Sequence, residues 1–241
     1  MQALRSSSPD FIYAIHGFLG ESSDWDEVFK NIQPSTVVTR RNFFSDEIFT
    51  DLNLERFIHD IEKQTQGKIG FRKIFIGYSL GGRIGLKLLE TRPDLFDHYI
   101  FISTHPGLTS DNDKITRLQA DQLWIKKLQE NSWENFLIAW NNQIVLKNSN
   151  TAQRSESHFK KNLLIDALSQ YSLGHQKNYS ALLLKYQDRI TWIIGDQDTK
   201  FIDVAEDLKQ KKILLDYKRI FSGHRVLLDN PQGLAIILES I

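Results

Sequence analysis

Ser79 is the residue of this chain whose surroundings are best suited to chemistry. It stands between glycines in Gly77–Gly81, after a short apolar run and before residues at helical spacing. A serine on so tight a turn from strand to helix projects its hydroxyl above the sheet, and the glycines let the backbone close up. The alternative is an ordinary serine at a helix N-cap, which serines favour. We predict that Ser79 carries the reactive hydroxyl.

A serine hydroxyl is a poor nucleophile or base alone, so it needs an imidazole to take its proton and a carboxylate to orient that imidazole. In chains with this turn the partners follow in the order serine, acid, histidine. Asp198 and His224 each stand shortly after an apolar run. We therefore predict a triad of Ser79, Asp198 and His224. Asp196 is the rival acid, because strand ends predicted from sequence err by about two residues. For His224 the alternative is an exposed loop histidine.

Negative charge that develops on a substrate beside Ser79 requires N–H donors that are already in place. The main chain of Leu80, the residue after the serine, is the first predicted donor. The second is Phe18, in the glycine-containing loop His16–Gly20. His16 itself either lines the pocket or holds this loop by hydrogen bonds.

Strand and helix patterns alternate along the chain and predict how these residues are positioned. The apolar runs that predict strands are 11–15, 36–39, 73–76, 99–103, 190–194 and 213–220. The segments with helical spacing are 25–32, 54–64, 80–91, 203–210 and 231–241. Between 104 and 186 only helical patterns occur. We predict an α/β fold with a mostly parallel sheet flanked by helices. Its core is formed by residues 1–103 and 187–241, and residues 104–186 form an inserted helical cap.

Composition narrows the class of protein. A chain of 241 residues commonly forms one globular unit. Thirty basic residues balance thirty acidic ones, so we expect neither nucleic-acid binding nor stable membrane association, and a small molecule is the expected partner. The polar start Met1 to Asp10 and the short apolar run after it fit neither a signal peptide nor a membrane span. We therefore expect a cytoplasmic protein, and the lack of cysteine is compatible with a reducing compartment; the oligomeric state stays open.

No metal or cofactor is expected. His16, His98 and His105 lack the spacing of metal ligands. The glycines around Ser79 serve the turn, and their spacing matches neither a phosphate-binding P-loop nor a dinucleotide fingerprint.

These residues resemble the α/β-hydrolase fold and, within it, the 2-succinyl-6-hydroxy-2,4-cyclohexadiene-1-carboxylate synthase family of menaquinone biosynthesis. The similarity runs from one end of the chain to the other. The matching segments are His16–Gly20 with Asp24-Trp25, Gly77–Arg83, His105–Leu108, Asp121 with Trp124, Trp140, Gly195–Phe201, and Gly223-His224 with Asn230-Pro231. Tyr78, Arg83 and His105–Leu108 together are more selective than the glycine motifs, which many hydrolases of this fold share.

The resemblance implies a lyase that removes a proton from a carboxylate-bearing ring and expels pyruvate, with the triad serine as base. It implies a small anionic substrate bound by Arg83 and Arg117, because guanidinium groups bind carboxylates through two parallel hydrogen bonds. It also implies a pocket lined by Tyr78 and Trp140. The alternatives are an Arg83 paired with a surface acid, an Arg117 in solvent and a Trp140 in the cap core.

The chain departs from the family at Ser169, where the family carries another cap arginine. One carboxylate contact is therefore missing unless another cation replaces it. The candidates within the cap are Lys160, Lys161 and Arg154. We also hypothesise that Arg40 or Arg41, after the second strand, supplies the lost charge.

The same triad also allows other functions. The main alternative is a serine hydrolase of small esters or carbon–carbon bonds, in which Ser79 attacks a carbonyl. A third possibility is a binding protein without activity, which the filled triad positions disfavour.

Overall fold

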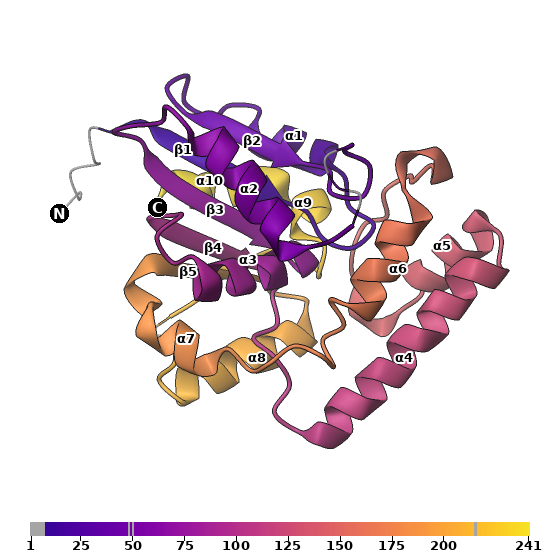
Figure 1. Cartoon of the computed structure of the whole chain (residues 1–241). Helices are drawn as coiled ribbons and strands as arrows, with labels where there is room; N and C mark the ends of the chain where they lie inside the picture. Colours follow the sequence, from indigo (N-terminus) through magenta and orange to yellow (C-terminus); the bar gives the residue numbers. More distant parts are fainter. Residues whose placement is uncertain (1–7, 48, 50, 215) are drawn as a thin grey trace.

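Six strands form one parallel sheet in the computed structural model, which describes residues 8–47, 49, 51–214 and 216–241 (Figure 1). The strands are β1 (Asp10–Ile15), β2 (Val37–Arg41), β3 (Arg72–Tyr78), β4 (His98–Ile102), β5 (Ile190–Gly195) and β6 (Lys218–Ile220). They lie in the order β2-β1-β3-β4-β5-β6, and every neighbouring pair is parallel. The fold class predicted from the alternation of strands and helices is confirmed. Of the polar start, residues 1–7 lie outside the described residues.

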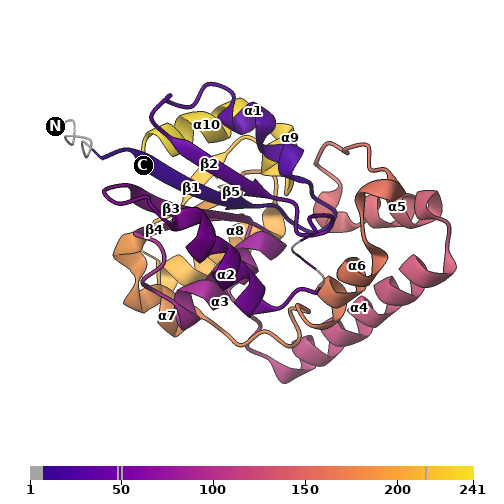
Figure 2. The same ribbon diagram turned by 45° about the horizontal axis from the view of Figure 1, so that its top comes forward.

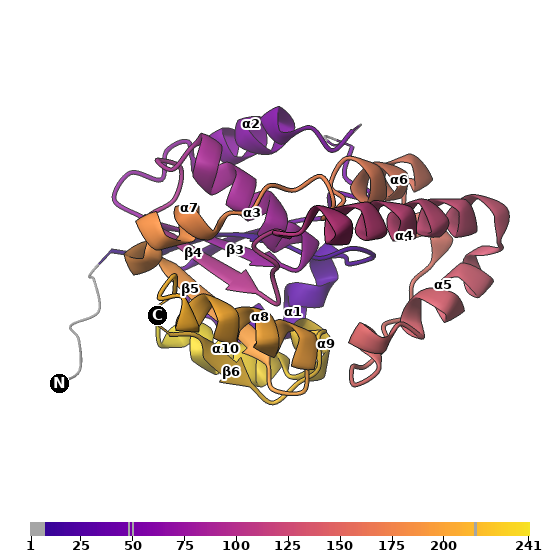
Figure 3. The ribbon, with the colours of Figure 1, turned by 90° about the horizontal axis from the view of Figure 1, so that it is seen from below.

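Helices cover both faces of the sheet (Figure 3). One face carries α2 (Leu54–Thr65) and α3 (Leu80–Thr91), and the other carries α1 (Asp26–Phe29), α9 (Val226–Asp229) and α10 (Pro231–Glu239). Successive strand residues point to opposite faces. In β1, Tyr13 and Ile15 pack on the first face, whereas Ile12 and Ala14 pack on the second. The remaining core helix, α8 (Thr199–Gln210), follows β5.

Between β4 and β5 the chain forms helices only. They are α4 (Asp111–Glu130), α5 (Trp133–Asn141), α6 (Lys161–Ser169) and α7 (Ser180–Lys185), with 3-10 turns at Ile144–Leu146, Glu156–His158 and Gln187–Arg189. We call residues 104–186 the cap. Helices α4, α5 and α6 extend beyond the carboxyl ends of the strands (Figures 1 and 2). By contrast, Leu183 of α7 is buried in the same apolar cluster as α3. None of the described helices is long and apolar enough to cross a membrane.

The main chain of α3 packs directly against the ends of β1 and β3. A Cβ atom on Gly81 would lie 2.4 Å from the carbonyl oxygen of Ile15, and one on Gly77 would lie 2.6 Å from the Cα of Gly82. Real Cβ atoms do not approach main-chain atoms so closely, and these atoms cannot move without shifting the sheet. The glycines are therefore required by close packing as well as by the turn.

Arg40 and Arg41 lie within β2, and neither lines the cavity described below. The Arg41 guanidinium donates to Asp60 Oδ2 at 2.6 Å and to Oδ1 at 2.8 Å. Tyr13 Oη donates to Asp60 Oδ2 at 2.6 Å. Arg40 pairs with Asp26 at the surface. The hypothesis that either arginine supplies charge to the site is wrong, because neither lines the cavity and each is already paired with an aspartate.

We expect Asp60→Ala to lower the free energy of unfolding by about 3 kcal/mol, because it leaves Arg41 and Tyr13 without their partner in a buried setting. The Asp60 side chain is 7% exposed and that of Arg41 is 21% exposed. Urea denaturation measures the loss. Asp51→Ala is the control, since its pair with Arg56 is 45% and 44% exposed and should contribute less than about 1 kcal/mol. Equal losses in the two variants would contradict this account.

Candidate active site

Ser79 occupies the turn between β3 and α3 in a strained conformation. Its φ is +50° and its ψ is −107°, outside the regions that residues with a side chain ordinarily adopt. Its N–H donates to the carbonyl oxygen of Ile102 in the neighbouring strand at 2.9 Å, which holds the turn in place. Its side chain makes no capping hydrogen bond to α3. The hydroxyl is therefore left for other partners.

The structure brings Ser79, His224 and Asp198 together. His224 Nε2 lies 3.3 Å from Ser79 Oγ, and His224 Nδ1 lies 2.6 Å from Asp198 Oδ2. Because a carboxylate only accepts, Nδ1 carries the proton and Nε2 accepts from the serine. A nucleophile–base distance of this length is common before substrate binds. The rival acid Asp196 instead accepts from the N–H of Ser222 at 3.2 Å.

Burial and a helix terminus support this arrangement. Asp198 is 3% exposed and His224 is 6% exposed. Asp198 is also the N-cap residue of α8, where the helix dipole favours a negative charge. The three side chains come from the ends of β3, β5 and β6, which meet at one edge of the sheet.

Phe18 and Leu80 both line the cavity in front of Ser79. Neither main-chain N–H donates a hydrogen bond within the part of the chain that the structure describes. Leu80 is the first residue of α3, where an N–H has no partner inside the helix. Both groups are thus free to stabilise an oxyanion or enolate.

His16 supports the loop that carries Phe18 and does not line the main cavity. It is fully buried, its Nδ1 donates to the carbonyl oxygen of Gly17 at 2.8 Å, and its ring stacks on Phe43 at 4.2 Å. Burial lowers the pKa of His16 to about 4, so it is neutral near pH 7. Of the two roles considered for His16, the structure shows the loop-holding one.

A cavity of about 140 Å³ lies between Ser79 and the cap. Its lining residues are Phe18, Tyr78, Ser79, Leu80, Arg83, Ser103, His105, Arg117, Trp140, Gln143, Val145, Leu146, Ala167, Leu168, Leu173, Lys200, Phe201, His224 and Arg225. The four basic side chains in this set are not matched by any carboxylate among the described lining residues. In a chain with a formal net charge of zero, this cavity concentrates positive charge, which attracts anionic ligands.

Arg83 lines the cavity from the first turn of α3. Its Nη1 donates to the carbonyl oxygen of Tyr171, and no carboxylate within the described residues forms an ion pair with it. Burial, followed by the charge of Arg117, lowers the pKa of Arg83 to about 9. Two surface acids that could have paired with it, Glu90 and Asp94, bind other cations: Glu90 pairs with Lys177, and Asp94 pairs with Arg92.

Arg117, Trp140 and Tyr78 line the cavity and also contact other residues of the protein. Arg117 Nε donates to Asp121 Oδ2 at 2.8 Å, so its charge is partly neutralised, although it lines the cavity. The ring of Trp140 packs 4.5 Å from that of Phe18 and 4.9 Å from that of Trp124, so it is both a cavity wall and part of the cap core. Tyr78 lies 5.7 Å from the ring of His224. Burial raises the pKa of Tyr78, so its hydroxyl stays protonated.

The structure does not place the suggested replacements for the missing cap arginine in the main cavity. Ser169 is also absent from its lining. Lys160 donates to the carbonyl oxygen of Asp46, Lys161 pairs with Glu156, and Arg154 pairs with Asp24.

Two other cations, Lys200 and Arg225, line the cavity and were missed from the sequence. Lys200 is two residues after Asp198, and Arg225 directly follows His224. Proximity to the predicted triad was the available signal.

Ser103, at the end of β4, is a further residue that sequence reasoning missed. It is fully buried, it lines the cavity, and its φ is +44°. Its hydroxyl has no hydrogen-bond partner among the residues that the structure describes. A buried unpaired hydroxyl and a left-handed backbone both cost stability. Next to it His105 Nδ1 accepts from the N–H of Gly107, so its proton is on Nε2, and burial lowers the pKa of His105 to about 3. No group of three metal-ligating side chains occurs in the described ranges.

We expect Ser103→Gly to raise the free energy of unfolding by about 1 kcal/mol. The substitution removes the left-handed strain and the unpaired hydroxyl, which together outweigh the entropy cost of glycine. Thermal denaturation compares it with Ser103→Ala, which removes the hydroxyl but keeps the strain and should gain less. A gain with glycine no larger than that with alanine, or a loss with glycine, would refute the strain.

Acid should destabilise the fold below pH 6.5 because of His16. Its pKa is about 4 in the folded state and about 6.5 in the unfolded chain, so the unfolded state binds the proton more readily. The stability present above pH 6.5 is therefore lost as the pH falls toward 4, by up to about 1.4 kcal/mol per pH unit for this residue. Urea denaturation at several pH values should give a smaller slope for His16→Asn, which keeps a donor at the Nδ1 position.

Two half-buried histidines, His98 and His105, whose pKa is also lowered, contribute with the same sign, so the slope of the wild type exceeds that of one residue. The control is His59→Asn at an exposed position, which should leave the slope unchanged. An unchanged slope in His16→Asn would contradict the assignment.

Comparison with known proteins places the fold in a family. The α/β-hydrolase fold model matches residues 11–233. The 2-succinyl-6-hydroxy-2,4-cyclohexadiene-1-carboxylate synthase of Enterobacter sp. is 24% identical over 249 residues, which cover 98% of this chain and 94% of that protein. The synthase of the same name from Klebsiella pneumoniae is also 24% identical, with coverage of 99% and 97%.

Among solved structures, MenH from S. aureus superposes with a TM-score of 0.78 at 17% sequence identity, covering 98% of this chain and 94% of that one. This likeness supports the same architecture over the full length. The chain belongs to the α/β-hydrolase fold family.

Proposed function

We propose that this protein is a carbon–oxygen lyase that eliminates pyruvate from 2-succinyl-5-enolpyruvyl-6-hydroxy-3-cyclohexene-1-carboxylate. The product is 2-succinyl-6-hydroxy-2,4-cyclohexadiene-1-carboxylate, an intermediate of menaquinone biosynthesis. The observation that carries the proposal is the cavity beside Ser79, with four basic side chains and no carboxylate among its described lining residues. The substrate has three carboxylates, on the ring, the succinyl arm and the enolpyruvyl group. Distant similarity to synthases of this name along 98% of the chain supports the same choice.

In the proposed reaction the serine acts as a base. His224 takes the proton of the Ser79 hydroxyl, and Ser79 Oγ removes the proton from the ring carbon that bears the succinyl group. The electron pair left on that carbon forms a new ring double bond to the neighbouring carbon, and the existing ring double bond shifts by one position. The bond between the ring carbon and the enolpyruvyl oxygen then breaks. The leaving group takes up a proton and becomes pyruvate.

The rest of the site supports the charged intermediate and the protonated histidine. The N–H groups of Phe18 and Leu80 are available to the oxygen of the succinyl ketone, on which negative charge develops when the ring proton leaves. Asp198 holds the Nδ1 proton of His224 and stabilises the imidazolium that forms. Arg83 and Arg117 hold carboxylates of the substrate on the cap side of the cavity.

A serine hydrolase is the alternative on the same residues, because the triad geometry also suits attack on a carbonyl. A neutral ester gains nothing from four basic side chains around the serine, whereas an anionic substrate is attracted by them. The charge of the cavity therefore favours the anionic substrate.

The direct test is pyruvate release from the proposed substrate, with enzyme-free decay subtracted. We expect Ser79→Ala to lower kcat by at least about 10²-fold, since it removes the base from the reacting atoms. Ser157→Ala, at an exposed cap position, is the matched control and should retain wild-type activity. Release by the wild type no faster than the blank would reject the lyase, and an ester and diketone panel would then test the hydrolase.

A further inference from the structure

Arg225 lies where the main cavity meets a second, smaller one. The second cavity has a volume of about 40 Å³, and its lining includes Leu19, Gly20 and the ion pair of Asp24 with Arg154. Phe18, Tyr78 and Arg225 line both cavities. A single water needs roughly 10–15 Å³ of such space, so the second cavity admits a group of carboxylate size but not a six-membered ring.

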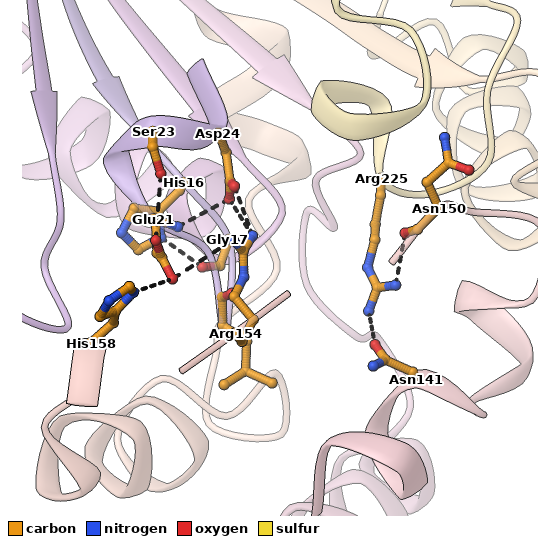
Figure 4. Close-up of polar contacts among 11 residues, drawn as sticks. His16, Gly17, Glu21, Ser23, Asp24, Asn141, Asn150, Arg154, His158 and Arg225 are labelled. Atoms are coloured by element: carbon orange, nitrogen blue, oxygen red, sulfur yellow. Dashed lines mark hydrogen bonds and ion pairs between the residues drawn. The ribbon is translucent and has the colours of Figure 1, made fainter. Parts of the chain in front are cut away.

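In the described part of the chain, only neutral acceptors hold the Arg225 guanidinium (Figure 4). Its Nη1 donates to the carbonyl oxygen of Asn150 at 3.0 Å, and its Nη2 donates to Asn141 Oδ1. Both acceptors belong to the cap. Among the described residues no carboxylate forms an ion pair with Arg225. A guanidinium has five N–H donors. Two of them are engaged here, which leaves three for a ligand.

The nearest carboxylates are committed to other groups. Asp24 accepts from Arg154 Nη2 at 2.7 Å through both of its oxygens. Asp229 accepts from the N–H of Asn150 at 2.6 Å and from the N–H of Gly223 at 3.0 Å. Arg154 and Arg225 are thus both arginines of the second cavity, but only Arg154 is neutralised. Arg225 is half-buried, and burial, the largest influence on it, lowers its pKa.

We infer that Arg225 is the receptor for the carboxylate at the end of the substrate's flexible succinyl arm. The ring has to lie in the larger cavity, because the proton to be removed must reach Ser79. The two cavities meet beside Arg225, and the space there is narrow, so only an extended arm can enter it. Arg225 then takes the place of a cap arginine in binding the third carboxylate. This assignment rests on the proposed function for the identity of the arm.

The test uses two stable aromatic ligands that differ at the arm alone. One is 4-oxo-4-(2-carboxyphenyl)butanoate, and the other is the corresponding butanamide, which has the same shape and a neutral arm. Calorimetric titration of the wild type should show at least tenfold tighter binding of the carboxylate, since charged hydrogen bonds are about twice as strong as neutral ones. In Arg225→Gln we expect this preference to fall below about twofold.

Arg219→Gln is the control, because it removes one positive charge at an exposed position of β6 and should keep the full preference. Arg225→Lys keeps the charge but loses the planar fork, so it should retain only part of the preference. It also serves as the test variant if Arg225→Gln does not fold. An undiminished preference in whichever variant folds overturns the assignment, as does equal weakening of both ligands.

The outcome is separable from that of the proposed reaction. If the wild type releases no pyruvate but Arg225→Gln loses the preference, the receptor stands and the lyase fails. If pyruvate is released and the preference is unchanged in the variants, the lyase stands and the receptor fails.

Discussion

The direct contact between the main chain of α3 and the carboxyl ends of β1 and β3 is the constraint on which the site depends. It holds Ser79 at a φ of +50°, a conformation that a free chain would leave. The missing Cβ atoms of Gly77 and Gly81 allow the approach, and the hydrogen bond from Ser79 to Ile102 joins the turn to the next strand. Any side chain at these glycines would push the helix outward and move the hydroxyl away from His224.

Other residues at the same edge of the sheet also have strained backbone conformations. Leu19 after β1, Ser79 after β3 and Ser103 after β4 all have positive φ without being glycine. Parallel strands end at one edge, so these residues lie close to the site: Ser79 and Ser103 line the main cavity, and Leu19 lines the second cavity beside it. Strain of this kind persists only where the surrounding packing enforces it. Here the packed core around the sheet provides that enforcement, and the strained residues of the site lower the stability of the fold.

The sequence was informative where a role depends on local order and poorly informative where it depends on contacts between distant segments. The turn at Ser79 depends on residues adjacent in the sequence. Asp198 and His224 follow their strands at short spacing, so the order of strands predicted that the three residues meet. The charge of Arg40 and Arg41 was assigned wrongly because the acids that neutralise them, Asp26 and Asp60, lie on helices whose placement the sequence did not reveal.

The cations of the main cavity also show that a sequence does not reveal which charged side chains are paired. Lys200 and Arg225 have no motif of their own, and whether an arginine is paired depends on which carboxylates the fold brings near it. Arg154 and Arg225 line one small cavity, yet Asp24 neutralises only the first. A pattern of residue types along the chain cannot distinguish these two cases. The difference arises from the path of the cap over the core.

That path also joins the cap to the loop that carries Phe18. Arg154 Nε donates to the carbonyl oxygen of Leu19 at 2.6 Å, while its Nη2 binds Asp24 (Figure 4). Leu19 adjoins Phe18, and its strained φ of +55° is held partly by this hydrogen bond. Movement of the cap segment around Arg154 away from the core would break these contacts and release the loop. Arg154 belongs to the cap and binds both Leu19 and Asp24 of the core. The position of the cap and the geometry of the N–H donor at Phe18 are therefore coupled.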